Sequence, residues 1–130
     1  MKKLLIFSTF GMSLVFLLGE IARRGFDYFL VNTTTMVEDL LCGLLLFVAA
    51  TMLMKGHAQS KIMMVAAWGY AFGGMFVPFF AHFEAFMRGV AIRDDHPIDD
   101  VGSIVLKGTI WLLCGVFFLI ALRSDEQKSR

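Results

Sequence analysis

Charged residues are scarce in this 130-residue sequence: Asp, Glu, Lys and Arg make up 18% of it, and the formal net charge is +1. A chain this close to neutral lacks the basic footprint of a nucleic-acid-binding protein, so we expect no nucleic-acid partner. Cysteine is rarer still. Cys42 and Cys114 stand alone in apolar stretches and form no CxxC pair, which removes the thiol-redox and zinc-ribbon interpretations.

Sequence motifs of enzymes are missing as well. The chain contains no nucleophile–base arrangement, phosphate loop or dinucleotide fingerprint, and it lacks the HExxH and Glu-x-x-His spacings of helical metal sites. The start, Lys2-Lys3 before an apolar run, is typical of a signal peptide, but no pair of small residues marks a cleavage site. We therefore expect the first apolar run to be retained as a helix, and we see no positive evidence for an enzyme.

Hydrophobic residues are abundant, at 58% of the chain, which is more apolar surface than a soluble domain of this size can bury. Four apolar windows are long enough to cross about 30 Å of hydrocarbon as helix, which takes roughly 20 residues. They are residues 4–22, 36–54, 62–87 and 104–122. The sequence therefore predicts an all-α integral membrane protein, with residues 1–130 as a single domain that forms a four-helix transmembrane bundle.

The distribution of charge predicts the orientation of this bundle. Four spans place both termini on one side of the membrane. Seven of the twelve basic residues lie on that side: Lys2, Lys3, Lys55, Lys61, Arg123, Lys128 and Arg130. The positive-inside rule therefore favours N-in and C-in, although a difference of seven against five leaves dual topology open. The Lys-Lys start and the compact loops indicate a bacterial inner membrane.

The third window contains most of the small residues that let two helices approach closely. Gly69 and Gly73 have the small-xxx-small spacing, and Gly108 and Gly115 of the fourth window share a helix face two turns apart. The partner of these faces is another helix, another copy of the chain or another membrane subunit. The predicted helix-packing residues are Gly69, Gly73, Gly74, Gly108 and Gly115.

A proline interrupts the same window. Pro78 has no N–H to bond to the carbonyl oxygen of Gly74, and both residues weaken a helix. The sequence therefore predicts that the third helix is kinked at Pro78. His82 follows one turn later, near the kink, and either bonds to a loop acid or serves as a proton relay or metal ligand.

Acidic residues near the helix ends are the other candidates for function. Glu20 precedes Arg23 and Arg24 by three and four residues, which is the spacing of helical ion pairs. The alternative is that Glu20, with His82, forms a proton or cation relay that faces the interior of the bundle.

The start of the second window carries two more acids. Thr35-Met36-Val37-Glu38 has the pattern of a capping box, which gives Glu38 a structural role, and Asp39 suits the positive end of a helix. Alternatively, Glu38, Asp39 and His82 meet at one end of the bundle and hold zinc or another transition metal.

A dense acidic loop precedes the fourth window and lies at the predicted non-cytoplasmic end. Its side chains can cap the fourth helix, a role we assign to Asp99 or Asp100, or collect a divalent cation. The predicted acidic-loop residues are Asp94, Asp95, Asp99 and Asp100.

Three functional classes are consistent with these residues. The first is a non-enzymatic interaction protein, either a homo-oligomer or an accessory subunit that binds other membrane subunits within the lipid bilayer. The second is a small transporter or channel, coupled to cations or protons, with an acidic non-cytoplasmic rim. The third is a metal-dependent membrane enzyme, for which a divalent metal is the expected cofactor.

Overall fold

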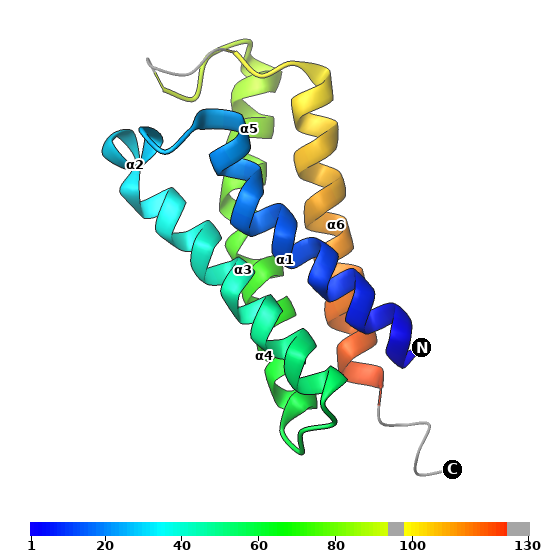
Figure 1. Ribbon diagram of the computed structural model, residues 1–130. Coiled ribbons are helices and arrows are strands. Elements are labelled where there is room, and N and C mark those ends of the chain that lie inside the picture. Colours follow the sequence, from blue (N-terminus) through cyan, green and yellow to red (C-terminus); the bar gives the residue numbers. More distant parts are fainter. Residues whose placement is uncertain (94–97, 125–130) are drawn as a thin grey trace.

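The structure is a computed structural model that describes residues 1–93 and 98–124, and within these residues it is 83% helical, without strands. Six helices follow one another along the chain (Figure 1): α1 (Lys2–Arg24), α2 (Tyr28–Val31), α3 (Thr33–Met54), α4 (Ser60–Gly74), α5 (Phe76–Arg88) and α6 (Val101–Arg123). Four segments are long and apolar enough to cross a membrane, namely α1, α3, α4 together with α5, and α6. The prediction of four long apolar helices is therefore confirmed.

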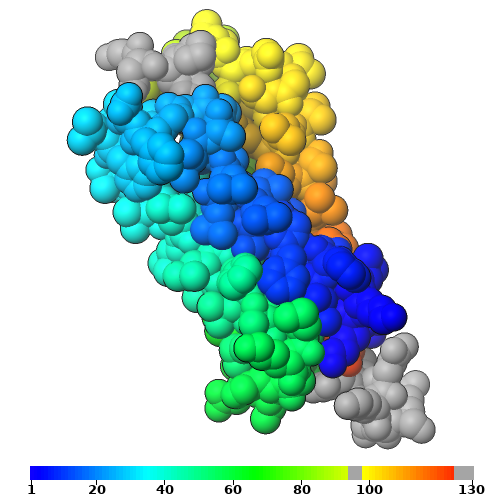
Figure 2. Space-filling model, viewed as in Figure 1, coloured from blue at the N-terminus to red at the C-terminus, as the bar shows by residue number. Residues whose placement is uncertain are grey.

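The helices pack in chain order, α1 against α3, α3 against α4, and α4 and α5 against α6. α1 begins and α6 ends at the same end of the molecule, whereas α2, the end of α5 and the start of α6 lie at the opposite end (Figure 1). In Figure 2, the side chains of α1 (blue) and α3 (cyan to green) form a continuous surface over this face. We call the end that carries α2 the loop end.

The buried core fills the half of the molecule nearest the termini. Its centre is Trp68 of α4, whose indole N–H donates to Thr9 Oγ1 of α1 at 3.1 Å. Thr9 in turn donates to the carbonyl oxygen of Leu5 at 2.6 Å, so the buried hydroxyl and indole satisfy each other. The hydrogen bond from Trp68 to Thr9 joins α4 to α1.

The closest helix contact in the core is between α1 and α3 at Gly43. A Cβ built there would lie 2.6 Å from Leu17 Cγ and 3.0 Å from the backbone nitrogen of Leu17, which leaves no space for a side chain. Beside it, Ser13 Oγ donates to the carbonyl oxygen of Gly43 at 2.8 Å. The sequence analysis did not single out Gly43, although it is the glycine on which α1 and α3 meet.

The interface of α4 and α5 with α6 is built from aromatic rings that lie on glycines. Trp111 of α6 stacks on Phe72 at 5.2 Å and on Phe79 at 5.6 Å between ring centroids. Three of the predicted packing glycines each receive a ring from the facing helix. The pairs are Phe118 on Gly69, Phe79 on Gly108 and Phe72 on Gly115.

The start of α3 differs from the prediction. α3 begins at Thr33, and the side chain of Asn32, its N-cap residue, accepts from the backbone N–H of Thr35 at 3.2 Å. Asparagine is at least as good an N-cap as threonine. The helix therefore begins earlier than a cap at Thr35 would allow. The predicted capping box of Thr35 and Glu38 is therefore wrong, and Glu38 lies more than one turn inside the helix.

The third predicted window is divided into two helices. α4 ends at Gly74 and α5 begins at Phe76, so the break falls at Met75. Pro78 cannot donate to the carbonyl oxygen of Gly74. The hydrogen-bond ladder resumes with the N–H of Phe79, which donates to the carbonyl oxygen of Met75 at 3.0 Å. The interruption therefore lies one turn before the proline, at the carbonyl that the proline leaves without a donor.

Candidate functional site

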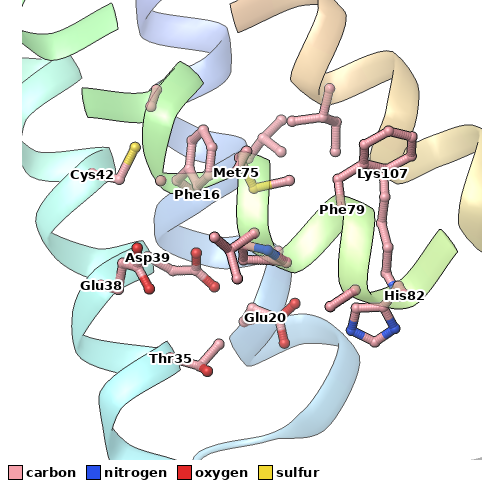
Figure 3. A pocket seen from close by; sticks show the side chains of 18 of the residues that line it. Phe16, Glu20, Thr35, Glu38, Asp39, Cys42, Met75, Phe79, His82 and Lys107 are labelled. Carbon is pink, nitrogen blue, oxygen red and sulfur yellow. The ribbon is translucent and has the colours of Figure 1, made fainter. Parts of the chain in front are cut away.

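A cavity of about 540 Å³ lies beyond the core, toward the loop end, between α1 and α3 on one side and α5 and α6 on the other. Phe16, Cys42 and Ala71 close it on the core side, and Arg24, Asn32 and Arg93 line it near the loops. The walls are largely apolar, but acidic and basic side chains from four helices reach it (Figure 3).

Glu20 reaches the cavity from the last turns of α1. Its Oε1 accepts from Arg23 at 2.8 Å, and its Oε2 lies 3.0 Å from Arg24 Nε, so the predicted ion pairs are confirmed. The Arg24 guanidinium also lies 4.2 Å from the centre of the Tyr28 ring. Glu20 thus holds two arginines at the end of α1 and lines the cavity, and its role as a relay stays a prediction.

Glu38 and Asp39 reach the cavity from α3. Figure 3 shows both carboxylates on the α3 side, facing Glu20 across the open space. Neither side chain forms a hydrogen bond or ion pair with any residue in the ranges 1–93 and 98–124. Two carboxylates therefore line a mostly apolar cavity without a hydrogen-bond or ion-pair partner in the described part of the chain, and the charges of Arg23 and Arg24 act on Asp39 only from a distance.

Gly74 makes room for one of these carboxylates. A Cβ built at Gly74 would lie 3.2 Å from Glu38 Oε1, so the acid rests against the backbone of α4. Gly73 differs, because a Cβ there would meet no atom of the described residues within 4 Å. The predicted packing role of Gly73 therefore stays a prediction that concerns a partner outside this chain.

On the opposite side of the cavity, one carboxylate joins α5 to α6. Asp99 Oδ2 is hydrogen-bonded to His82 Nδ1, and Asp99 Oδ1 accepts from Lys107 Nζ at 2.7 Å. The Asp99 side chain is only 3% exposed. Of the two alternatives for His82, the bond to a loop acid is thus confirmed, and a further role as a proton relay stays a prediction.

Two effects oppose each other at Asp99. Burial raises the pKa of the Asp99 carboxyl, but hydrogen bonds and charge from Lys107 and His82 outweigh it, so the pKa lies below its ordinary value of 3.8. Asp99 is therefore ionised at neutral pH. It serves as the shared anion between one cation of α6 and the imidazole of α5.

The other three acidic-loop residues are Asp94, Asp95 and Asp100. Asp100 is the N-cap of α6, and its Oδ1 accepts from the N–H of Ser103 at 2.7 Å, as predicted for one of the two aspartates. Asp94 and Asp95 lie outside the described residues. The loop acids that the structure describes therefore stabilise helix starts and pairs rather than gathering around a common point.

The predicted metal site is not assembled. In the ranges 1–93 and 98–124, no three His, Cys, Asp or Glu side chains come close enough together to hold a metal ion. Figure 3 shows the reason: Glu38 and Asp39 lie on the α3 side, whereas His82 lies across the cavity, where it is bonded to Asp99.

The basic side chains that line the cavity all have partners. Arg23 and Arg24 pair with Glu20, and Lys107 pairs with Asp99. Arg93 donates to the hydroxyl of Tyr28 at 3.1 Å. Among the described residues that line the cavity, the two acids of α3 lack such a hydrogen-bond or ion-pair partner, although Arg23 and Arg24 also act on Asp39 through their charge.

Two residues of the site were missed by the sequence analysis. Lys107 was not considered there, although a lysine inside an apolar span calls for an anionic partner and an acidic loop precedes it. Tyr70 gave no signal, because its position beside the cavity depends on how α4 packs against α3.

The chain matches no known protein family, no curated protein and no solved structure.

Proposed function

We propose that this protein is an integral membrane transporter that binds a cation in the cavity and exchanges it for protons. The four long apolar helices support a membrane location. The excess of basic residues on the side that carries the termini and the α3–α4 turn supports an N-in, C-in orientation in a bacterial inner membrane, with the loop end outside. The break at Met75 supports a kink of the third span that is caused by Pro78.

The observation that carries the proposal is the uneven pairing of charge around the cavity. Every basic side chain that lines the cavity has an acid or a tyrosine within hydrogen-bond distance, whereas Glu38 and Asp39 have no hydrogen-bond or ion-pair partner in the described part of the chain and only the more distant charges of Arg23 and Arg24 act on Asp39. A charge taken out of water without a partner costs several kcal/mol. A bound cation supplies the missing partner.

The same cost couples the cation to protons. A carboxylate in an apolar cavity is stabilised either by a proton or by a cation, so the two compete for Glu38 and Asp39. Binding of the cation releases protons, and uptake of protons releases the cation. Glu20 and His82 line the same cavity and are positioned to pass protons toward the loop end.

The test is proton movement in liposomes that contain the purified protein and an internal pH dye. We apply outward gradients of sodium, potassium, tetramethylammonium or benzyltrimethylammonium chloride, and we expect at least one of them to drive protons inward. The double variant Glu38→Gln, Asp39→Asn should abolish this signal because it removes both carboxylates.

The matched control is Glu84→Gln, which neutralises an exposed acid that pairs with Arg88 away from the cavity. We expect this variant to behave like the unmodified protein. Proton movement no faster than in empty liposomes with all four cations contradicts the proposal, as does equal movement with and without Glu38 and Asp39.

A second candidate function rests on Gly73. We propose that the open face of α4 at Gly73 packs against another copy of the chain or against a subunit of a larger membrane assembly. Small residues allow close helix contacts in membranes, and a Cβ built at Gly73 would meet no side chain or other helix of the described residues within 4 Å.

Native mass analysis in mild detergent tests this candidate. Gly73→Leu should reduce the copy number or release the co-purified partner, because a large side chain separates the two helix backbones. Gly11→Leu is the control, since Gly11 of α1 is equally open within the chain. A single copy in the unmodified protein, without a partner, would rule the candidate out.

A further inference from the structure

A second hollow lies on the outside of the molecule, between the start of α3 and Tyr70 of α4, with a volume of about 470 Å³. We call it the α3–α4 groove. Exposed side chains of α3 form most of its walls, among them Val37, which is 52% exposed. The lining residues are Thr33, Thr34, Val37, Glu38, Leu41 and Tyr70.

Glu38 and Tyr70 line both the groove and the cavity. They form a partition made of side chains. Gly74 lies one turn after Tyr70, so both residues of α4 face the same part of α3, and Glu38 Oε1 rests against Gly74. The partition consists of two side chains with rotatable bonds, not of helix backbone.

The chemistry of the cavity selects the kind of cation. A hard metal cation takes six or more oxygen ligands, whereas the α3 wall offers two carboxylates next to apolar side chains. An organic ammonium ion needs a counter-charge, apolar contact and an aromatic face, and Glu38, Phe79 and Tyr70 provide these. The volume is also in the range of sites for small organic ligands, about 300–1,000 Å³.

We infer that the ligand is an amphipathic organic ammonium ion that enters the cavity sideways, from the membrane through the α3–α4 groove, between Glu38 and Tyr70. This inference rests on the proposed function, because it names the cation and its route to the same carboxylates. The groove lies at the level of the first turns of α3, where the exposed Val37 and Leu41 stand beside the polar Thr33 and Thr34, which suits an ion with one apolar and one charged part.

The experiment separates the route from the binding site. The probe is radiolabelled benzyltrimethylammonium, and tetramethylammonium is the matched probe that has the same charged group without the aromatic ring. Val37→Trp fills the groove without lining the cavity, and Leu44→Trp places the same ring at an exposed position of α3 that lines neither hollow.

We expect Val37→Trp to slow the initial uptake of benzyltrimethylammonium into proteoliposomes by about tenfold, with an unchanged Kd by calorimetry in detergent, because a blocked route lowers both association and dissociation rates. Leu44→Trp should leave uptake and Kd unchanged. Tetramethylammonium should bind at least about tenfold more weakly, since it lacks the apolar contact.

Different results contradict the route, the ligand class and the proposed function. Uptake in Val37→Trp as fast as in Leu44→Trp, with binding still lost in Glu38→Gln, overturns the sideways route and leaves the proposed function intact. Equal affinity for the two probes overturns the amphipathic ligand class. Unchanged binding of benzyltrimethylammonium in Glu38→Gln, Asp39→Asn overturns this inference, and the proposed function falls with it only if cation-driven proton movement is also unchanged in that variant.

Discussion

Asp99 is the only buried acid among the residues that the structure describes. Its carboxylate accepts from Lys107 of α6 and is hydrogen-bonded to His82 of α5, in surroundings where its side chain is 3% exposed. Asp99→Asn leaves the Lys107 cation half-buried without its anion. We expect the free energy of unfolding, measured by denaturation in mixed micelles, to fall by about 3–5 kcal/mol, as for other broken buried pairs.

The control for Asp99 is an exposed pair of the same kind. Glu84 and Arg88 lie 2.6 Å apart with side chains 60% and 70% exposed, so Glu84→Gln should change stability by less than about 1 kcal/mol. Equal losses in Asp99→Asn and Glu84→Gln would mean that burial adds nothing to the pair at Asp99.

The pH dependence of stability gives a second check on Asp99. Because the folded-state pKa of its carboxyl lies below the ordinary value of 3.8, the carboxylate contributes stability that is fully present above pH 3.8 and is lost as the pH falls through the folded-state pKa. The difference in unfolding free energy between the unmodified protein and the Asp99→Asn variant should follow the same course. A difference that disappears near neutral pH contradicts this account.

For single residues, the sequence predicted the ion pairs within one helix. It missed the ion pairs and hydrogen bonds that depend on how the chain packs. The pairs of Glu20 with Arg23 and Arg24 follow from helical spacing alone. Glu38 was assigned to a capping box because its spacing from Thr35 fits one. The choice between Asn32 and Thr35 as the cap depends on where the preceding chain turns, which local spacing does not determine.

Among the helices, the contact of α1 with α3 is the one most sensitive to a single methyl group. Gly43→Ala would place a Cβ 3.0 Å from the backbone nitrogen of Leu17, so a helix must shift rather than a side chain. We expect a loss of about 1–3 kcal/mol in the same unfolding assay, together with disruption of the bond from Ser13 to the Gly43 carbonyl.

Gly11→Ala is the matched control for Gly43, because Gly11 lies in a helix with nothing within 4 Å of its added Cβ. Alanine favours a helix over glycine by about 1 kcal/mol, so this variant should be neutral or slightly more stable. Equal effects of the two substitutions would mean that α1 and α3 do not approach closely at Gly43.

The elements themselves were predictable where the physics is local. A continuous apolar run of about 20 residues favours a helix whatever surrounds it, so all four windows were located. The helix partners were not predictable in this way. Gly69 was predicted from its spacing with Gly73, yet Gly69 receives the Phe118 ring, whereas a Cβ added at Gly73 would meet no other helix among the described residues. Spacing does not reveal which helix faces which glycine.

For the whole molecule, the orientation in the membrane decides whether the loop end, where the cavity lies, faces the cytoplasm or the outside. With both termini inside, the α2 end lies outside and the turn between α3 and α4 lies inside. Phe26, near α2, is 71% exposed, and His57, in the α3–α4 turn, is exposed too. In a variant whose own cysteines are replaced, Phe26→Cys should react with an impermeant maleimide in bacterial spheroplasts, and His57→Cys should react only after the membrane is opened.

This labelling experiment tests the charge argument and the transport proposal together. The difference of seven basic residues against five is small, so the orientation depends on few side chains. Labelling of His57→Cys in closed spheroplasts, with Phe26→Cys protected, would reverse the orientation and make the cavity face the cytoplasm. Labelling of both to half of their maximum would instead mean that two orientations coexist, in which case cations and protons would be exchanged from either side of the membrane by the same Glu38 and Asp39.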